Sequence, residues 1–340
     1  MKLLTYIIAF TCILSILGCD SGNESKEKEL PKVSITSPSE GYIYLNGIYT
    51  GYKTPKDMFV SPGNHVIGVA MDHTKTYLRR EVEIGTENIR IDLENSDKPE
   101  PKLWKGLWVG IREATLDGKS TTYTEEELDK GYAYFQWSIK EHFEDYSYNT
   151  IKWEISRKDI VDPVTVDVME SGDHTITPSS MGRLLPEIQP GVYDNVFSFF
   201  KERDEDCVFK GGYFALAWLD PFDSDIETGY VTVKFDATEP IETHLSAYKA
   251  EDPGVYCHEW LHTVGEYFFQ SKGVKMPKKA PANNLMVHAA DHVYNYTFPW
   301  LTWYQDVMAG RVQSDGKFVG IGPENFLKYT IRETALQTQP

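Results

Sequence analysis

Residues 255–268 read VYCHEWLHTVGEYF, and this stretch decides how the second half of the chain is interpreted. His258 and His262 are four residues apart, with Glu259 directly after the first histidine. Residues four apart lie on one face of an α-helix, so both imidazoles can bind a single metal ion. Glu259 lies about a quarter turn round the helix, where its carboxylate can hold a water molecule against that ion. The alternative is an amphipathic helix whose two histidines are satisfied core residues.

The flanking residues predict where this helix begins and ends. Asp252 is expected to cap its N-terminus, and Pro253 suits the first turn. Gly273 stands beyond its end. Zinc held by the two histidines would polarise a substrate carbonyl and lower the pKa of a water towards ~7, and Glu259 would take the proton as general base. The stretch therefore predicts a zinc cofactor and hydrolysis of peptide bonds.

The letters HEWLH resemble the HExxH signature of the zincin metalloproteases, which implies that family's fold and activity. The longer run HEWLHTVGEYF is similar to the start of the metzincin pattern HExxHxxGxxH, with Gly265 at the glycine position. The last position of that pattern is Phe268 instead of histidine, so the third metal ligand must come from elsewhere.

The third ligand is predicted in segment 283–296, which contains His288, Asp291 and His292. His288 is the first choice, and it follows Leu285-Met286, which resembles the methionine-bearing turn of metzincins. Asp291 is the second choice, because DHVYN weakly resembles an aspzincin element, and His292 is the third. Glu266 lies about 80° round the helix from His258 and two turns away, which indicates an outer or surface position.

Other chemistry-bearing residues of the chain allow two interpretations each. Tyr294 or Tyr296 could donate a hydrogen bond to an oxyanion, although core packing is the simpler interpretation for both. Cys207 and Cys257 could form a disulfide in an exported protein or remain two buried thiols. Residues 298–312, FPWLTWYQDVMAGRV, have the spacing of a core helix that packs on the histidine helix.

The N-terminus predicts export. Lys2 is followed by an apolar run at residues 3–17, shorter than the roughly 20 residues of a membrane-spanning helix. The letters ILGC at residues 16–19 resemble a bacterial lipoprotein signal, which implies cleavage after Gly18 and a lipid on Cys19. Residues 1–18 are therefore a predicted signal peptide, and residues 19–32 are a polar, flexible tether.

Short alternating strands separated by turn residues predict an all-β domain at residues 33–93. Asn46-Gly47 suits a tight hairpin, because both residues tolerate positive φ. The runs SPSEGYIYLNGIYTGYKTP and SPGNHVIGV resemble the PEGA domain. That resemblance implies a β-sandwich-like accessory module without catalytic machinery.

A Pro-containing charged linker is expected at residues 94–102, followed by a larger domain at residues 103–334. Strands are predicted within residues 107–115, 132–139, 148–156, 164–168, 192–200, 211–219 and 229–235, and helices over most of the remainder. The expected fold class is α+β, with a small all-β PEGA-like domain before a larger zincin-like domain that contains the active-site helix.

Composition narrows the possible partners. The chain has 340 residues and a net charge of −17, which repels nucleic acid. The predicted function is an exported, lipid-anchored zinc metalloprotease of the cell envelope, at the outer membrane or cell surface, which acts on a protein or peptide. The alternative is a non-catalytic surface lipoprotein that binds a glycan, a peptide or a host protein through its aromatic residues, which include 21 Tyr.

Overall fold

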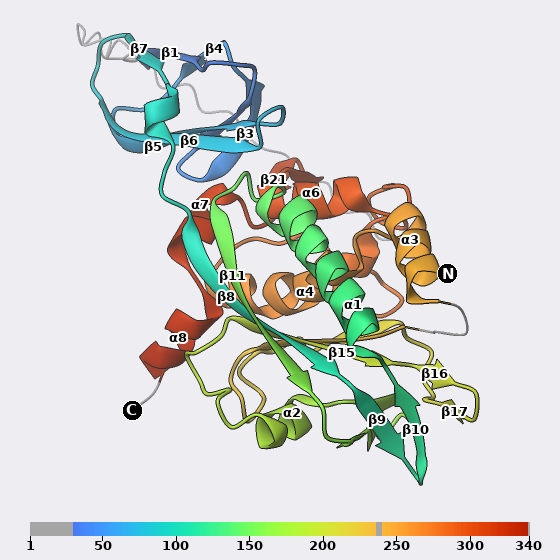
Figure 1. The fold of residues 1–340 in the computed structure, drawn as a ribbon. Coiled ribbons are helices and arrows are strands. Elements are labelled where there is room, and N and C mark those ends of the chain that lie inside the picture. The colour runs from blue at the N-terminus through green and yellow to red at the C-terminus, as the bar shows by residue number, and fades with distance from the viewer. Residues whose placement is uncertain (1–29, 236–239, 339–340) are drawn as a thin grey trace, which may run out of the picture.

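The computed structural model describes residues 30–235 and 240–338, in a small N-terminal β region and a larger α+β region (Figure 1). The predicted fold class is confirmed. Cys19, with the predicted signal peptide and most of the tether, lies outside the described residues. Within the described ranges, no helix combines the length and apolar character that crossing a bilayer requires.

Two sheets form the N-terminal β region, in the strand orders β4-β1-β7 and β3-β2-β5-β6. Their apolar faces enclose a core that includes Val33, Ile43 and Val69. The hairpin between β2 and β3 turns at Asn46-Gly47, where φ is 52° and 81°, as the sequence predicted. The strands are β1 (Lys32–Thr36), β2 (Tyr42–Leu45), β3 (Ile48–Lys53), β4 (Lys56–Phe59), β5 (Gly63–Met71), β6 (Thr76–Ile84) and β7 (Ile89–Asp92).

A five-stranded sheet organises the larger region, in the order β11-β8-β15-β19-β18. The first four strands, β11 (Ile151–Ile160), β8 (Lys102–Ile111), β15 (Asn195–Lys201) and β19 (Gly229–Phe235), run parallel. The edge strand β18 (Ala215–Ala217) runs antiparallel to β19. Parallel strands are normally covered on both faces, and alternate side chains here enter two different cores.

Helices cover both faces of this sheet (Figure 1). Trp108 and Phe197 pack in the core beneath α1 (Glu125–Ser138) and α4 (Val255–Thr263), whereas Val109 and Val196 pack beneath α2 (Pro178–Leu184). The remaining elements are β9 (Glu113–Leu116), β10 (Lys119–Thr122), β12 (Val164–Thr165), β13 (Asp167–Val168), β14 (His174–Thr175), β16 (Arg203–Asp204), β17 (Cys207–Val208), β20 (Val312–Ser314), β21 (Lys317–Val319), α3 (Ile241–Glu251), α5 (Phe269–Ser271), α6 (Leu301–Ala309), α7 (Pro323–Lys328) and α8 (Ile331–Thr338).

The strand predicted at residues 132–139 is wrong, because these residues belong to helix α1 and its π-helical extension, Ile139–Glu144. Aromatic residues favour strands, but a capping box between Thr124 and Glu127 starts a helix here. The buried residues then lie along one face of the helix, at Leu128, Gly131, Tyr134, Phe135 and Ser138. The capping signal and the helical period outweigh the local strand preference.

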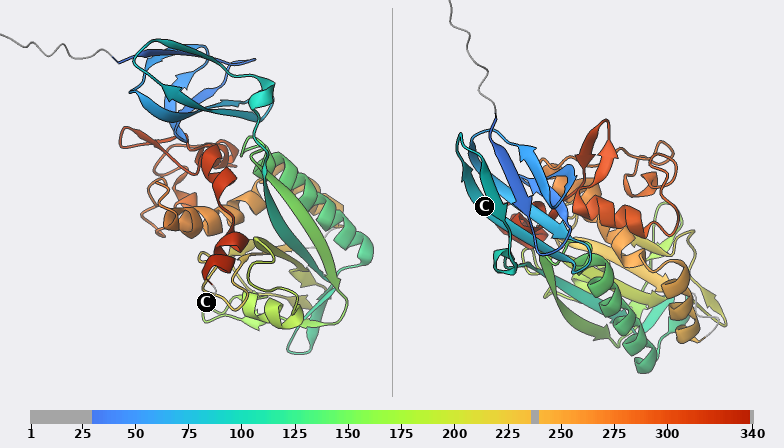
Figure 2. Two further views of the ribbon diagram at one scale, coloured as in Figure 1. Left: turned by 90° about the vertical axis from the view of Figure 1, so that its left-hand side faces the viewer. Right: turned by 90° about the horizontal axis from the view of Figure 1, so that it is seen from above.

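The N-terminal β region packs against the C-terminal segments of the larger region (Figure 2). The Tyr44 hydroxyl donates to the carbonyl of Ala309 at the end of α6, over 2.8 Å. Tyr77 and Arg79 both donate to Glu324 on α7, over 3.0 and 2.9 Å. The side chains and the carbonyl that form these three hydrogen bonds are buried or half-buried. The two regions therefore share a specific polar interface.

Candidate metal centre

Gly254 is the N-cap residue of helix α4, which begins at Val255, so the prediction that Asp252 caps it is wrong. The backbone N–H of Asp252 bonds to the carbonyl of Tyr248 and closes the preceding helix α3. Gly254 is required where α4 starts, because a Cβ there would lie 2.7 Å from the ring of Tyr304. The close approach of α6 to this end of α4 therefore depends on a glycine.

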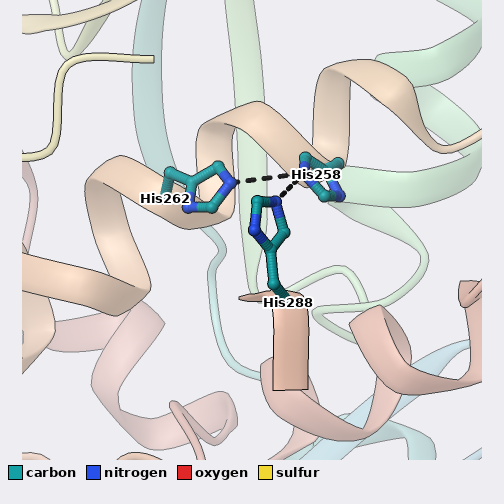
Figure 3. Close-up of side chains that lie close together, drawn as sticks. All are labelled: His258, His262 and His288. Carbon is teal, nitrogen blue, oxygen red and sulfur yellow. Dashed lines mark hydrogen bonds between the residues drawn. The ribbon is translucent and has the colours of Figure 1, made fainter. Parts of the chain in front are cut away.

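Three imidazoles converge at the face of α4 (Figure 3). His258 Nε2 lies 3.2 Å from His262 Nε2 and 3.2 Å from His288 Nε2. His288 comes from a short 3₁₀ turn, Val287–Ala289, that faces the helix. Zinc bonds imidazole nitrogen at ~2.0–2.1 Å in a tetrahedron, which sets neighbouring donor atoms about 3.3 Å apart. His258 Nε2 therefore lies at the spacing of a zinc site from each of the other two nitrogens, and the ligand atoms of all three histidines lie within 4.8 Å of one another.

The electrostatics of the cluster favour the ligand form of histidine. Burial and the two neighbouring imidazoles hold the pKa of His258 well below its usual value. Burial also lowers the pKa of His288, with His262 acting in the same direction. Neutral imidazole is the form that binds metal, so the site is prepared without an energetic cost for deprotonation near neutral pH.

Glu259 lies buried beside the cluster, with Oε1 3.9 Å from His258 Nε2. Burial raises the pKa of its carboxyl to about 7, and His262 partly offsets this effect. A general base works best when its pKa lies near the working pH. The carboxylate is thus suited to accept a proton from a water near the three nitrogens.

A cavity of about 360 Å³ opens onto the cluster. One wall is the edge strand β18, from Ala215 to Ala217, and the other contains Glu259 and the three histidines. β18 pairs only with β19 among the described strands, which leaves its second edge open. An open edge presents backbone N–H and C=O groups to whatever occupies the cavity.

Tyr304 contacts His258 and Glu266 contacts His262 on the side away from the cluster. Tyr304 was not predicted as a site residue, whereas an outer or surface position was expected for Glu266. Tyr304 Oη lies 2.9 Å from His258 Nδ1, so an Nδ1–H can donate to it while Nε2 remains free for metal. A histidine ligand commonly has such an outer partner. The sequence offered no direct signal for Tyr304, because it lies 46 residues away on another helix.

Glu266 connects His262 to the loop that carries His288. Its Oε1 lies 3.6 Å from His262 Nδ1 and accepts the backbone N–H groups of Met286 and Val287, directly before His288. Burial opposes ionisation, but the interactions with His262 and Val287 hold the pKa of Glu266 below its usual value. Glu266 is four residues after His262, and this i,i+4 spacing alone places the two side chains on one face of a helix.

The other candidates of segment 283–296 lie outside the cluster. Among the described residues, these three histidines are the one group of three or more His, Cys, Asp or Glu whose ligand atoms all lie within 4.8 Å of one another. His292 is exposed and lies 3.7 Å from Asp291. The hydroxyl of Tyr294 donates to Ser314 and that of Tyr296 to Asp306, so both are engaged away from the site.

The two described cysteines are free and buried, so the disulfide alternative does not hold. Burial alone raises the pKa of the Cys257 thiol above its usual value, and its sulfur lies 3.9 Å from that of Met308. Such a thiol is unreactive, because the thiolate is the form that acts as a nucleophile.

Comparisons with known proteins identify the N-terminal β region. Residues 30–97 match the PEGA domain family. The predicted resemblance to that domain is therefore confirmed. No curated protein matches the chain. Among solved structures, metalloproteinase-II from Bacteroides fragilis is similar over 61% of this chain and 70% of its own, with 12% identity and a TM-score of 0.24. At that TM-score the likeness is too weak to support a function.

Proposed function

We propose that the protein is a zinc-dependent metallopeptidase that is exported and anchored to the cell envelope by a lipid on Cys19. The observation that carries the proposal is the convergence of His258, His262 and His288, whose ligand atoms lie within 4.8 Å of one another beside buried Glu259. The anchor rests on the sequence ILGC at residues 16–19, and the matched PEGA domain fits an accessory role outside the catalytic region.

Each residue of the site has one task in this proposal. His258, His262 and His288 hold the metal, which supplies Lewis-acid polarisation of a carbonyl and increased acidity of water. Glu259 accepts the proton of the attacking water at its carboxylate and returns it to the leaving amine. Tyr304 and Glu266 fix the orientation of the first two imidazoles.

The open edge of β18 favours an extended peptide as substrate. A peptide strand laid along residues 215–217 can pair with the free backbone groups, and its scissile bond then lies over Glu259 and the histidines. Main-chain pairing gives affinity without demanding a particular sequence, while the cavity walls select side chains. Protein or peptide substrates therefore fit the site better than a compact small molecule.

Three variants of the full chain test the proposal. Glu259→Gln should retain about one zinc per chain and lose hydrolysis of a casein or peptide substrate by a factor of ~10²–10⁴. His288→Ala should lose zinc and hydrolysis together. His292→Ala is the matched control, because this histidine is exposed and outside the cluster, and it should change neither property.

Two results would contradict the proposal. A wild-type protein purified without chelators that contains no zinc and hydrolyses no peptide would favour the non-catalytic binding lipoprotein. Unchanged hydrolysis in Glu259→Gln would exclude this residue as the base. Incorporation of labelled palmitate into wild type but not into Cys19→Ala tests the anchor independently of catalysis.

A further inference from the structure

A second cavity, distinct from the metal centre, lies between the PEGA domain and the C-terminal part of the larger region. Its volume is about 560 Å³, within the range of ~300–1,000 Å³ that is usual for small-molecule sites. It shares no lining residue with the cavity at the histidines. Pockets between domains are frequent ligand sites.

One side of this interdomain pocket is apolar. Ile48 and Tyr49 on β3 face Phe318 and Val319 on β21. The rings of Tyr49 and Phe318 meet across the domain boundary with centroids 4.5 Å apart. Ile48 is 64% exposed, which is unusual for a large apolar side chain at a domain junction. The wall therefore offers unburied apolar surface to a ligand.

The other side of the pocket is positively charged. Lys272, Lys275 and Lys317 line it, and among the described residues no carboxylate lies within ion-pairing distance of their ammonium groups. The chain as a whole has 51 acidic and 34 basic residues. Three lysines gathered without an acidic partner are therefore a local reversal of the overall charge, and they complement an anion.

The ammonium group of Lys272 lies beside aromatic rings and has no carboxylate partner among the described residues. Its ammonium lies 5.5 Å from the ring centroid of Phe268 and 5.8 Å from that of Tyr329, against aromatic surface instead of a counterion. Burial lowers the pKa of this lysine. A cation that is partly removed from water gains more from a neighbouring anion than an exposed one does.

We propose that this pocket binds a small anionic amphiphile, that is, a molecule with one acidic group on an apolar body. The acidic group would lie among Lys272, Lys275 and Lys317, and the body would cover Ile48 and Phe318. Inorganic phosphate would leave the apolar wall uncovered. Because the ligand contacts β3 and β21 together, it binds only when the PEGA domain is docked, and it stabilises the docked arrangement.

Fluorescence titration of the full chain with 11-(dansylamino)undecanoic acid tests the pocket. We expect saturable binding, a rise in Tm with probe concentration, and displacement by decanoate but not by decanol or inorganic phosphate. Lys317→Ala, which removes an exposed cation, and Lys272→Ala should each weaken binding about tenfold. Lys98→Ala is the matched control, since Lys98 is exposed and does not line the pocket, and it should bind like wild type.

Several outcomes would overturn the proposal. These are no saturable binding, equal displacement by decanol and decanoate, or affinities unchanged in both lysine variants. Stronger displacement by a short glutamate-rich peptide than by decanoate would assign the pocket to acidic peptides. Zinc content and peptide hydrolysis of Lys317→Ala should equal those of wild type, so failure of this proposal is distinguishable from failure of the metallopeptidase proposal.

Discussion

Replacing Glu266 with alanine should weaken zinc binding without removing any metal ligand. The Glu266 carboxylate is almost fully buried and accepts two backbone N–H groups of the segment that presents His288. Hydrogen bonds to a charged group contribute about 1.5–3 kcal/mol each, so the loss of both costs at least ~3 kcal/mol of loop stabilisation. Loss of an outer partner typically reduces metal affinity 10–100-fold, and we expect a value in that range.

Competition with a chromogenic chelator measures this effect directly, and urea unfolding of the zinc-free protein measures the accompanying loss of stability. Glu266→Gln is the matched variant, because the amide oxygen keeps an acceptor of the same shape while the charge is removed. It should lose less affinity than Glu266→Ala. If zinc affinity in the alanine variant stays within about twofold of wild type, the link from Glu266 to the His288 loop has no role in metal binding.

Two further predictions concern residues around the same helix. Tyr304→Phe removes the hydroxyl beside His258 Nδ1, so zinc affinity in the chelator assay should fall about tenfold; unchanged affinity would exclude Tyr304 as a positioning residue. Burial raises the pKa of Asp252 to about 6 from 3.8, so the folded zinc-free protein holds this proton more tightly than the unfolded chain. Its free energy of unfolding should therefore fall as pH rises from about 4 to about 6, by ~1–2 kcal/mol after allowance for partial exposure. Asp252→Asn should lack this component, and parallel stability–pH curves for the two proteins would contradict it.

Local patterns predicted the parts of the site that lie within one helical turn. His258, Glu259 and His262 could be recognised because the period of the helix places them, whatever the rest of the fold does. His288 was ranked first only through its neighbours, since its approach to the helix depends on a loop 26 residues after His262. Tyr304 depends on the packing of α6 against Gly254, which no local pattern encodes.

The errors in the predicted elements have the same physical origin. The aromatic run at residues 132–139 has strand propensity, but the capping box eight residues upstream and the fit of Gly131 against Phe199 select a helix. Asp252 looked like a cap because sequence alone does not show that α3 ends there. By contrast, the hairpin at Asn46-Gly47 was predicted correctly, because the tolerance of positive φ is a property of these residue types themselves.

Helix α6 contacts both the histidine cluster and the PEGA domain, and this affects which form of the protein should be used in assays. The side chain of Tyr304 contacts His258, and the last carbonyl of the helix, on Ala309, accepts a hydrogen bond from Tyr44 of the PEGA domain. A fragment without residues 30–97 would leave that carbonyl without its donor and would expose Tyr148 and Glu324 to water. Such a fragment is a poor substitute for the intact chain, and assays of hydrolysis or zinc uptake should keep residues 30–97 in place.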